Sequence, residues 1–222
     1  MQFTLVSYKS VAALGLFVAA LVAGAASASA QDAKLNVSPE LAARMAAEKE
    51  ARKACKIDIC KAFASGGSGA ITCDVTKTWA KEEILSRVVG GSYVWGYGHM
   101  QCTLALNLDK AELGKALSEA AAKISFPEHK LICNVDDADA AKGQAFSVNV
   151  ALTPVVSFEK GEAKSVDLQN VKAEGSSVAS AAVSSMMAVD KVSGLVSSAA
   201  AKEINAFIYG KCDADGVKIV RK

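Results

Sequence analysis

Alternating apolar and polar side chains predict several strands in the middle of the chain. Successive strand side chains point to opposite faces, so a period of two in hydrophobicity indicates a strand with one covered face. In residues 146–158, Phe, Val, Leu and Pro occupy the even positions, and mostly Ser, Asn, Thr and Ala the odd ones. Residues 70–79 and 129–135 also alternate. A hairpin turn at 159–162 leads into a return strand at 163–172.

A further long strand is predicted from Gly90 to Leu108. Its first half places Tyr93, Trp95, Tyr97 and His99 on one face. The opposite face carries small and apolar residues, namely Val94, Gly96, Gly98, Met100, Cys102, Leu104, Leu106 and Leu108. The pattern predicts a strand with one core face and one aromatic-to-polar face.

Helices are predicted before, between and after the strands along the chain. Residues 40–63 are rich in Ala, Leu, Met, Glu, Lys and Arg, which favour helix, and residues 31–39 form a flexible start. Shorter helices are expected at 80–89 and 109–123. The tail, 176–209, is also helical, but one unbroken helix there would be about 50 Å long. Because a domain of this size is only about 40 Å across, a break is predicted around Asp190 to Gly194.

These elements predict an α+β fold. Long alternating strands joined partly by a hairpin favour a mainly antiparallel sheet of about five strands, formed by region 70–172. The helices are expected to pack on one face of this sheet. Residues 31–222 are long enough to form a single domain with a sizeable core.

The first thirty residues have the three-part pattern of a cleaved signal peptide. Lys9 precedes an apolar run from Val11 to Val22, and Ala28-Ser29-Ala30 offers a cleavage site. A membrane anchor is the alternative, but the uncharged stretch is shorter than the roughly 20 residues that cross a bilayer. The mature chain, 31–222, is expected in the periplasm or secreted, and it contains no apolar segment long enough to span a membrane.

Charge argues against nucleic acid as a partner. The sequence has 25 basic and 23 acidic residues, and Lys9 is the only charged residue of the predicted signal peptide. A nearly neutral mature chain creates no strong positive field for nucleic acid or for an anionic membrane surface.

All six cysteines lie in the predicted mature chain, and an even number in an exported protein predicts disulfides. Zinc is less favoured, because no two cysteines have Cys-x-x-Cys spacing. Six cysteines allow fifteen pairings, among which the sequence alone does not decide. The predicted helix and strand positions favour helix-to-sheet bridges, and the preferred set is Cys60–Cys73, Cys102–Cys133 and Cys55–Cys212.

The candidate binding residues are Tyr93, Trp95, Tyr97 and His99. Tyr and Trp combine apolar area with a polar tip, so a row of them can stack on a sugar, a lipid chain or a partner protein. The same rings could instead pack under a helix or loop as a second small core, and aromatic stripes more often do so.

The sequence therefore favours an exported, non-enzymatic binding or envelope protein that holds an apolar or amphipathic ligand, or a partner, through this aromatic face. One alternative is a structural or interaction protein of the cell envelope without a small ligand. An enzyme is less favoured, because no catalytic motif such as Gly-x-Ser-x-Gly or His-Glu-x-x-His occurs. No cofactor or metal site is predicted.

Overall fold

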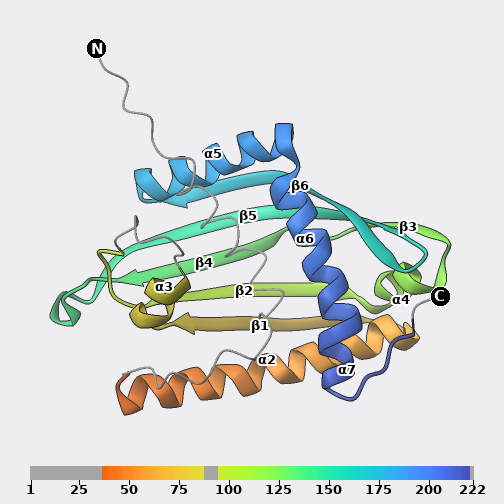
Figure 1. Cartoon of the computed structure of the whole chain (residues 1–222), viewed down its shortest axis with the longest axis horizontal. Helices are drawn as coiled ribbons and strands as arrows, with labels where there is room; N and C mark the ends of the chain where they lie inside the picture. Colours follow the sequence, from red (N-terminus) through yellow and green to blue (C-terminus); the bar gives the residue numbers. More distant parts are fainter. Residues whose placement is uncertain (1–36, 88–94, 221–222) are drawn as a thin grey trace.

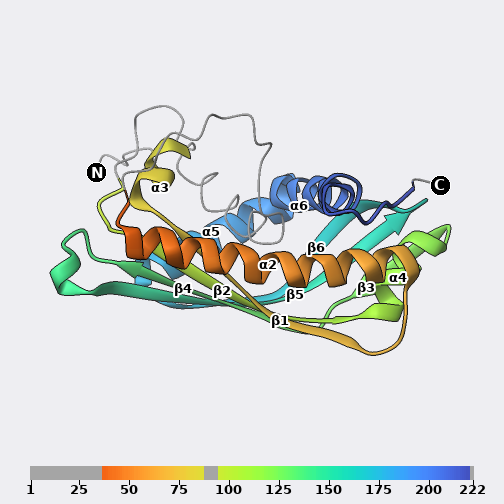
Figure 2. The same cartoon turned by 90° about the horizontal axis from the view of Figure 1, so that it is seen from below.

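The computed structural model describes residues 37–87 and 95–220. Within them the chain forms a six-stranded antiparallel sheet with helices α2, α3, α5 and α6 on one face (Figures 1 and 2). This confirms the predicted disulfide-stapled α+β class, with one strand more than expected. The predicted signal peptide, the start of the chain up to residue 36, and Tyr93 lie outside the described residues.

The strands are β1 (Ala70–Trp79), β2 (Met100–Asp109), β3 (Ala121–Ser125), β4 (His129–Asp136), β5 (Gln144–Glu159) and β6 (Glu162–Gly175). The α-helices are α2 (Pro39–Ser65), α3 (Lys81–Arg87), α4 (Lys110–Ser118), α5 (Ser177–Ser193), α6 (Leu195–Ala206) and α7 (Cys212–Ala214). A 3-10 turn, η1 (Ala140–Lys142), follows β4, and a π-helical turn, η2 (Phe207–Lys211), joins α6 to α7.

The long strand β5 organises the sheet. One of its edges pairs first with β4 and then with β3, while β6 lies along the other edge. Pro154 lies between these two partners, since pairing with β4 ends at Leu152 and pairing with β3 begins at Val155. A residue without a backbone N–H is tolerated where the ladder changes partner.

Strand β3 corrects the prediction that a helix runs from 109 to 123. Helix α4 ends at Ser118, and Ala121–Ser125 pairs with β5 instead. The segment Ala-Ala-Lys-Ile-Ser has helix-forming residues and hardly alternates. Its extended form therefore comes from pairing with a distant strand, which overrides local propensity.

The long strand predicted from Gly90 is wrong for residues 95–99, because β2 begins only at Met100. Both neighbours of β2 stop at this level: Met100 pairs with Trp79 at the end of β1 and with Val135 near the end of β4. The aromatic segment has no neighbouring strand to extend along, so its alternation does not produce a strand. From Met100 to Leu108, the even-numbered residues face the core as predicted, all of them buried except half-buried Leu106.

Helix α2 covers the free edge of β1. The carboxylate of Glu48 accepts a hydrogen bond from the backbone N–H of Thr78, and Arg52 donates one to the backbone carbonyl of Thr76. Glu48 also accepts a hydrogen bond from the Gln101 side chain at 2.8 Å. These contacts satisfy polar groups of an edge strand, and they hold α2 along that edge of the covered face rather than over the middle of the sheet.

The three disulfides are Cys55–Cys73, Cys60–Cys212 and Cys102–Cys133. The cross-strand pair Cys102–Cys133 agrees with the prediction, whereas Cys60–Cys73 and Cys55–Cys212 are wrong. The reason is the different rise of helix and strand. The ten helical residues from Cys55 to the end of α2 rise about 15 Å. The turn after α2 and the first residues of β1 cover a comparable length, so Cys55 lies level with Cys73. Cys60 bonds instead to Cys212, at the start of α7.

The C-terminal helices complete the covering layer. The break between α5 and α6 falls at Gly194, inside the predicted interval, and the Asp190 carboxylate accepts backbone hydrogen bonds from Val196 and Ser197. Helix α6 is fixed to β6 by two hydrogen bonds between the Asn205 amide and the backbone of Ala163. The continuous helical run of α6, η2 and α7 crosses above the strands, and α7 lies beside α2 (Figure 1), where Cys212 is bonded to Cys60.

Candidate ligand-binding cavity

A cavity of about 650 Å³ lies between the covered face of the sheet, α2 and α6. Its floor consists of apolar side chains from neighbouring strands, among them Val75, Leu104, Leu106, Leu131, Leu152 and Val156. These residues meet there because of register, as the pairs Val75–Leu104 and Leu104–Leu131 show. The side chains that the alternation assigns to the core face thus form the floor of the cavity.

The two helices form the walls. Helix α2 contributes Ile59 and Phe63 from one side, and the C-terminal helical segment contributes Val196, Ala200, Ile204 and Phe207 from the other. The second set is spaced by four, four and three residues, which places all of it on one helix face. Because α2 is held at the edge of β1 and α6 is anchored on β6, the helices straddle the middle of the sheet without filling it.

The charged part of the lining is predominantly basic. It comprises the cationic residues Lys49, Arg52, Lys53, Lys56, Lys77 and Lys211 and the acidic residues Glu50, Glu203 and Asp215. Most of the cations come from α2, on which positions 49, 52, 53 and 56 share a face. The cavity thus combines an apolar interior with a positive rim.

Several of these cations are already engaged within the fold. Arg52 bonds the Thr76 carbonyl and lies 3.8 Å from the carboxylate of Glu48. Lys77 lies 3.8 Å from Glu83 and stands over the ring of Trp79, 4.7 Å from its centroid. These residues fix the rim rather than offering a free charge.

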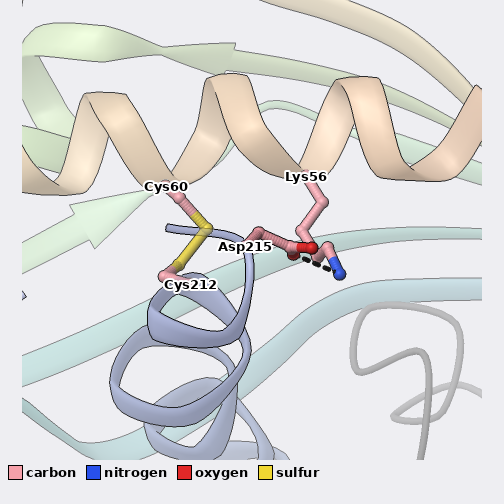
Figure 3. The surroundings of a disulfide bond; sticks show 4 residues. All are labelled: Lys56, Cys60, Cys212 and Asp215. Carbon is pink, nitrogen blue, oxygen red and sulfur yellow. Dashed lines mark ion pairs between the residues drawn. A yellow bond between two sulfur atoms is a disulfide. The ribbon is translucent and has the colours of Figure 1, made fainter. Parts of the chain in front are cut away.

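Lys56 and Asp215 form an ion pair between α2 and the segment after α7, next to the disulfide Cys60–Cys212 (Figure 3). The buried Oδ2 of Asp215 has this ion pair but no hydrogen bond among the described residues. Pair and disulfide together tie the segment Cys212–Asp215 to α2, next to the cavity that Lys56 and Asp215 line.

Lys211 differs from the other lining cations. Its Nζ atom is buried and has no hydrogen-bond partner in the described part of the chain. Burial lowers the pKa of the Lys211 ammonium; the negative charge of Glu203 opposes this shift, and the positive charge of Lys56 reinforces it. Lys56, which is paired with Asp215, is thus near enough for its positive charge to act on Lys211.

His129 also lines the cavity, at the start of β4. It is 5% exposed, its Nδ1 lies 2.7 Å from the Pro127 carbonyl, and its ring packs edge-on against Phe126. A ring nitrogen that faces a carbonyl at this distance donates a hydrogen bond to it, so Nδ1 of His129 carries a proton.

The predicted binding residues lie elsewhere. Trp95 and Tyr97 belong to the loop before β2 and pack with Phe146, at ring-centroid distances of 5.5 Å for Trp95–Tyr97 and 5.1 Å for Tyr97–Phe146. The indole N–H of Trp95 donates to the Gly98 carbonyl, and His99 Nδ1 accepts from the backbone N–H of Lys81. None of these three side chains lines the cavity, and a binding role for them stays a prediction.

Sequence reasoning missed the cavity residues, above all Lys211, Lys56 and His129. A signal was present in α2, where the basic positions 49, 52, 53 and 56 lie next to the apolar positions 59 and 63. Such a charged stretch is typical of a solvent-exposed helix, and the sequence does not reveal that it borders an apolar hollow.

Comparisons of the chain with protein-family models, curated proteins and solved structures gave no match. Within the described residues, no helix has the length and apolar character needed to cross a membrane, and no group of three or more His, Cys, Asp and Glu side chains is placed to hold a metal. Function is therefore inferred from the residues and the geometry of the cavity.

Proposed function

We propose that this protein is an exported, non-enzymatic binding protein that holds one apolar or amphipathic small molecule between the sheet, α2 and α6. The observation that carries the proposal is the cavity of about 650 Å³ with an apolar interior. Protein interiors are close-packed, with few voids larger than a water molecule. A hollow of this size falls in the range of about 300–1,000 Å³ that is typical of ligand sites.

The composition of the lining favours binding over catalysis. The described lining contains no Ser or Thr, and its cysteine, Cys55, is held in a disulfide. Its single imidazole, His129, has one nitrogen bound to a backbone carbonyl. A hydrolytic or group-transfer site needs a nucleophile next to a positioned base, and these residues supply no such pair.

Export is supported by the N-terminal pattern and by cysteine usage. All six cysteines are paired, and disulfides persist in oxidising compartments such as the bacterial periplasm or the cell exterior. An extracytoplasmic protein with an apolar hollow suits the carriage or retention of a molecule with low solubility in water.

Native mass spectrometry of the protein purified from its own host tests the proposal, with lipid extraction to identify the bound molecule. A co-purifying apolar or amphipathic compound of stoichiometric mass is expected. Ala200→Trp should fill part of the cavity and reduce the bound fraction several-fold, because Ala200 lies in the α6 wall. Ala206→Trp, at an exposed position at the end of α6, is the matched control. Equal occupancy in both variants would contradict a site in the cavity.

The aromatic loop provides a second comparison. Tyr97, 40% exposed, is the most accessible of its described rings, and Tyr97→Ala should leave the bound fraction unchanged if the ligand lies in the cavity. A loss of ligand in Tyr97→Ala, with normal binding in Ala200→Trp, would return the site to the originally predicted aromatic residues.

A further inference from the structure

We propose that the ligand of this cavity is a single-chain anionic amphiphile, such as a fatty acid, whose acidic head group is bound by Lys211 beside Lys56 while its chain lies over the leucines of the sheet. This inference rests on the proposed function, because it names the chemistry of a ligand in the same cavity. It assigns each part of the ligand to a different part of the lining.

The ammonium of Lys211 is a buried donor without a hydrogen-bond partner among the described residues. Buried polar groups in folded proteins nearly always have a hydrogen-bond partner, and an exception calls for an explanation such as a bound ion or ligand. Nζ of Lys211 is such an exception among the described residues. Glu203 is close enough to influence its charge, but it forms no ion pair or hydrogen bond with it in the described part of the chain. No described residue supplies an acceptor for this donor, and we assign that role to the acidic group of the ligand.

The charged residues of the lining favour an anionic head group. Lys56 lies close enough to Lys211 for its positive charge to act on it, and the Asp215 carboxylate that neutralises Lys56 is not hydrogen-bonded to Lys211. Exposed Lys49 and Lys53 add positive charge on the same face of α2. The acidic lining residues Glu50, Glu203 and Asp215 are outnumbered by the six cations, so the lining as a whole is positive and favours a carboxylate, sulfate or phosphate over an ammonium.

The apolar part of the lining favours an alkyl chain. Away from the charged residues, the lining is formed by strand side chains such as Leu104, Leu131 and Leu152 and by the α6 wall. This surface offers few hydrogen-bond partners, so a sugar or a peptide would leave its own polar groups unsatisfied there. An alkyl chain has none to satisfy, and each buried methylene group favours binding.

Isothermal titration of the full disulfide-bonded protein with dodecanoate, dodecanol and dodecylamine tests the inference, because the three probes share one chain and differ in head group. Dodecanoate should bind roughly 10-fold or more tightly than dodecanol, as expected for a charge-assisted hydrogen bond. Dodecylamine should bind most weakly. Lys211→Met should lower dodecanoate affinity to that of dodecanol and leave dodecanol unchanged. Lys202→Met, at an exposed position on α6, should behave as the wild type.

The outcomes separate the two proposals. If none of the three probes binds, the proposed function itself fails. This inference is wrong if dodecanol and dodecanoate bind equally to the wild type, or if Lys211→Met weakens both to the same extent. Either result would mean that the cavity binds apolar chains without distinguishing their head groups. A titration of carboxyl-labelled dodecanoate by ¹³C NMR gives an independent readout. The pKa of the bound carboxyl should be lower in the wild type than in Lys211→Met.

Discussion

Two charged side chains of the C-terminal helices are buried in opposite ways. The carboxylate of Asp190, 7% exposed, accepts hydrogen bonds from the backbone N–H groups of Val196 and Ser197 and from the Ser197 hydroxyl. Nζ of Lys211 is also buried, yet it has no hydrogen bond among the described residues. The fold thus supplies hydrogen bonds to the carboxylate of Asp190, which joins α5 to α6. Among the described residues, hydrogen bonds satisfy Asp190 but not Lys211, and this difference is why we assign Lys211 to ligand binding.

The largest effect is expected from the bridge that places the Lys211 turn against α2. Replacing both cysteines of Cys60–Cys212 by serine removes a loop closure of 152 residues, which should cost about 5 kcal/mol of unfolding free energy on the chain-entropy model. The Cys55–Cys73 pair, with a separation of 18, should cost about 3 kcal/mol. Urea unfolding without reductant measures both, and a larger loss from the shorter loop would refute this ordering.

The next effect is expected at Asp190. Asp190→Ala leaves two backbone N–H groups and one hydroxyl without their acceptor, and it should lower the unfolding free energy by about 2–3 kcal/mol. Asp190→Asn retains an acceptor oxygen for the backbone and should cost less. Thermal unfolding monitored by circular dichroism tests the pair. If Asp190→Ala is neutral, the hydrogen bonds at the α5–α6 junction contribute little, and the contrast with Lys211 loses its meaning.

The smallest effect has the opposite sign. Lys211→Met should raise the unfolding free energy of the ligand-free protein by about 1–2 kcal/mol near neutral pH, because it removes a buried ammonium without a hydrogen bond. Functional residues commonly reduce stability in this way. The melting temperature measures this gain, with Lys202→Met as the exposed control. A loss of stability in Lys211→Met would mean that the fold already satisfies this ammonium.

The gain from Lys211→Met should also depend on pH. Since the pKa of Lys211 is lowered in the folded state, the unfolded chain holds the proton more tightly, so the wild type gains stability relative to the variant as pH rises through that window. The gap between them should be fully present at neutral pH and close as pH approaches the ordinary lysine value of 10.5. A gap that widens over this range would reverse the sign of the argument.

The fold was predictable where periodicity is strong. Apolar side chains at even positions of 146–158 predicted β5, and the excessive length of one unbroken tail helix predicted the break at Gly194. Strand β3 was missed because its five residues carry no clear pattern of their own. In the segment before Met100 the alternation was misleading, since strand formation there would need neighbours that end at Trp79 and Asp136.

The cavity was not predictable for a different reason. The sequence shows that Leu104 and Leu131 face a covering layer, but not whether that layer touches them. The gap depends on where α2 and α6 are anchored, through Glu48, Arg52 and Asn205, and these contacts join residues far apart in the chain. Lys211, between a glycine and a cysteine near the end of the chain, has no sequence context that indicates burial.

The connectivity of the cysteines has a consequence for how the protein is made. Chains are synthesised from the N-terminus, so Cys55, Cys60 and Cys73 become available long before Cys212. If neighbours were oxidised in order of appearance, Cys55 would bond to Cys60, which is not a native pair. Cys60 has to remain reduced, or be released from a wrong partner, until the last helical turn arrives. Where a wrong bond forms first, native pairing requires thiol–disulfide exchange, which takes seconds to hours depending on the oxidant and the isomerase present.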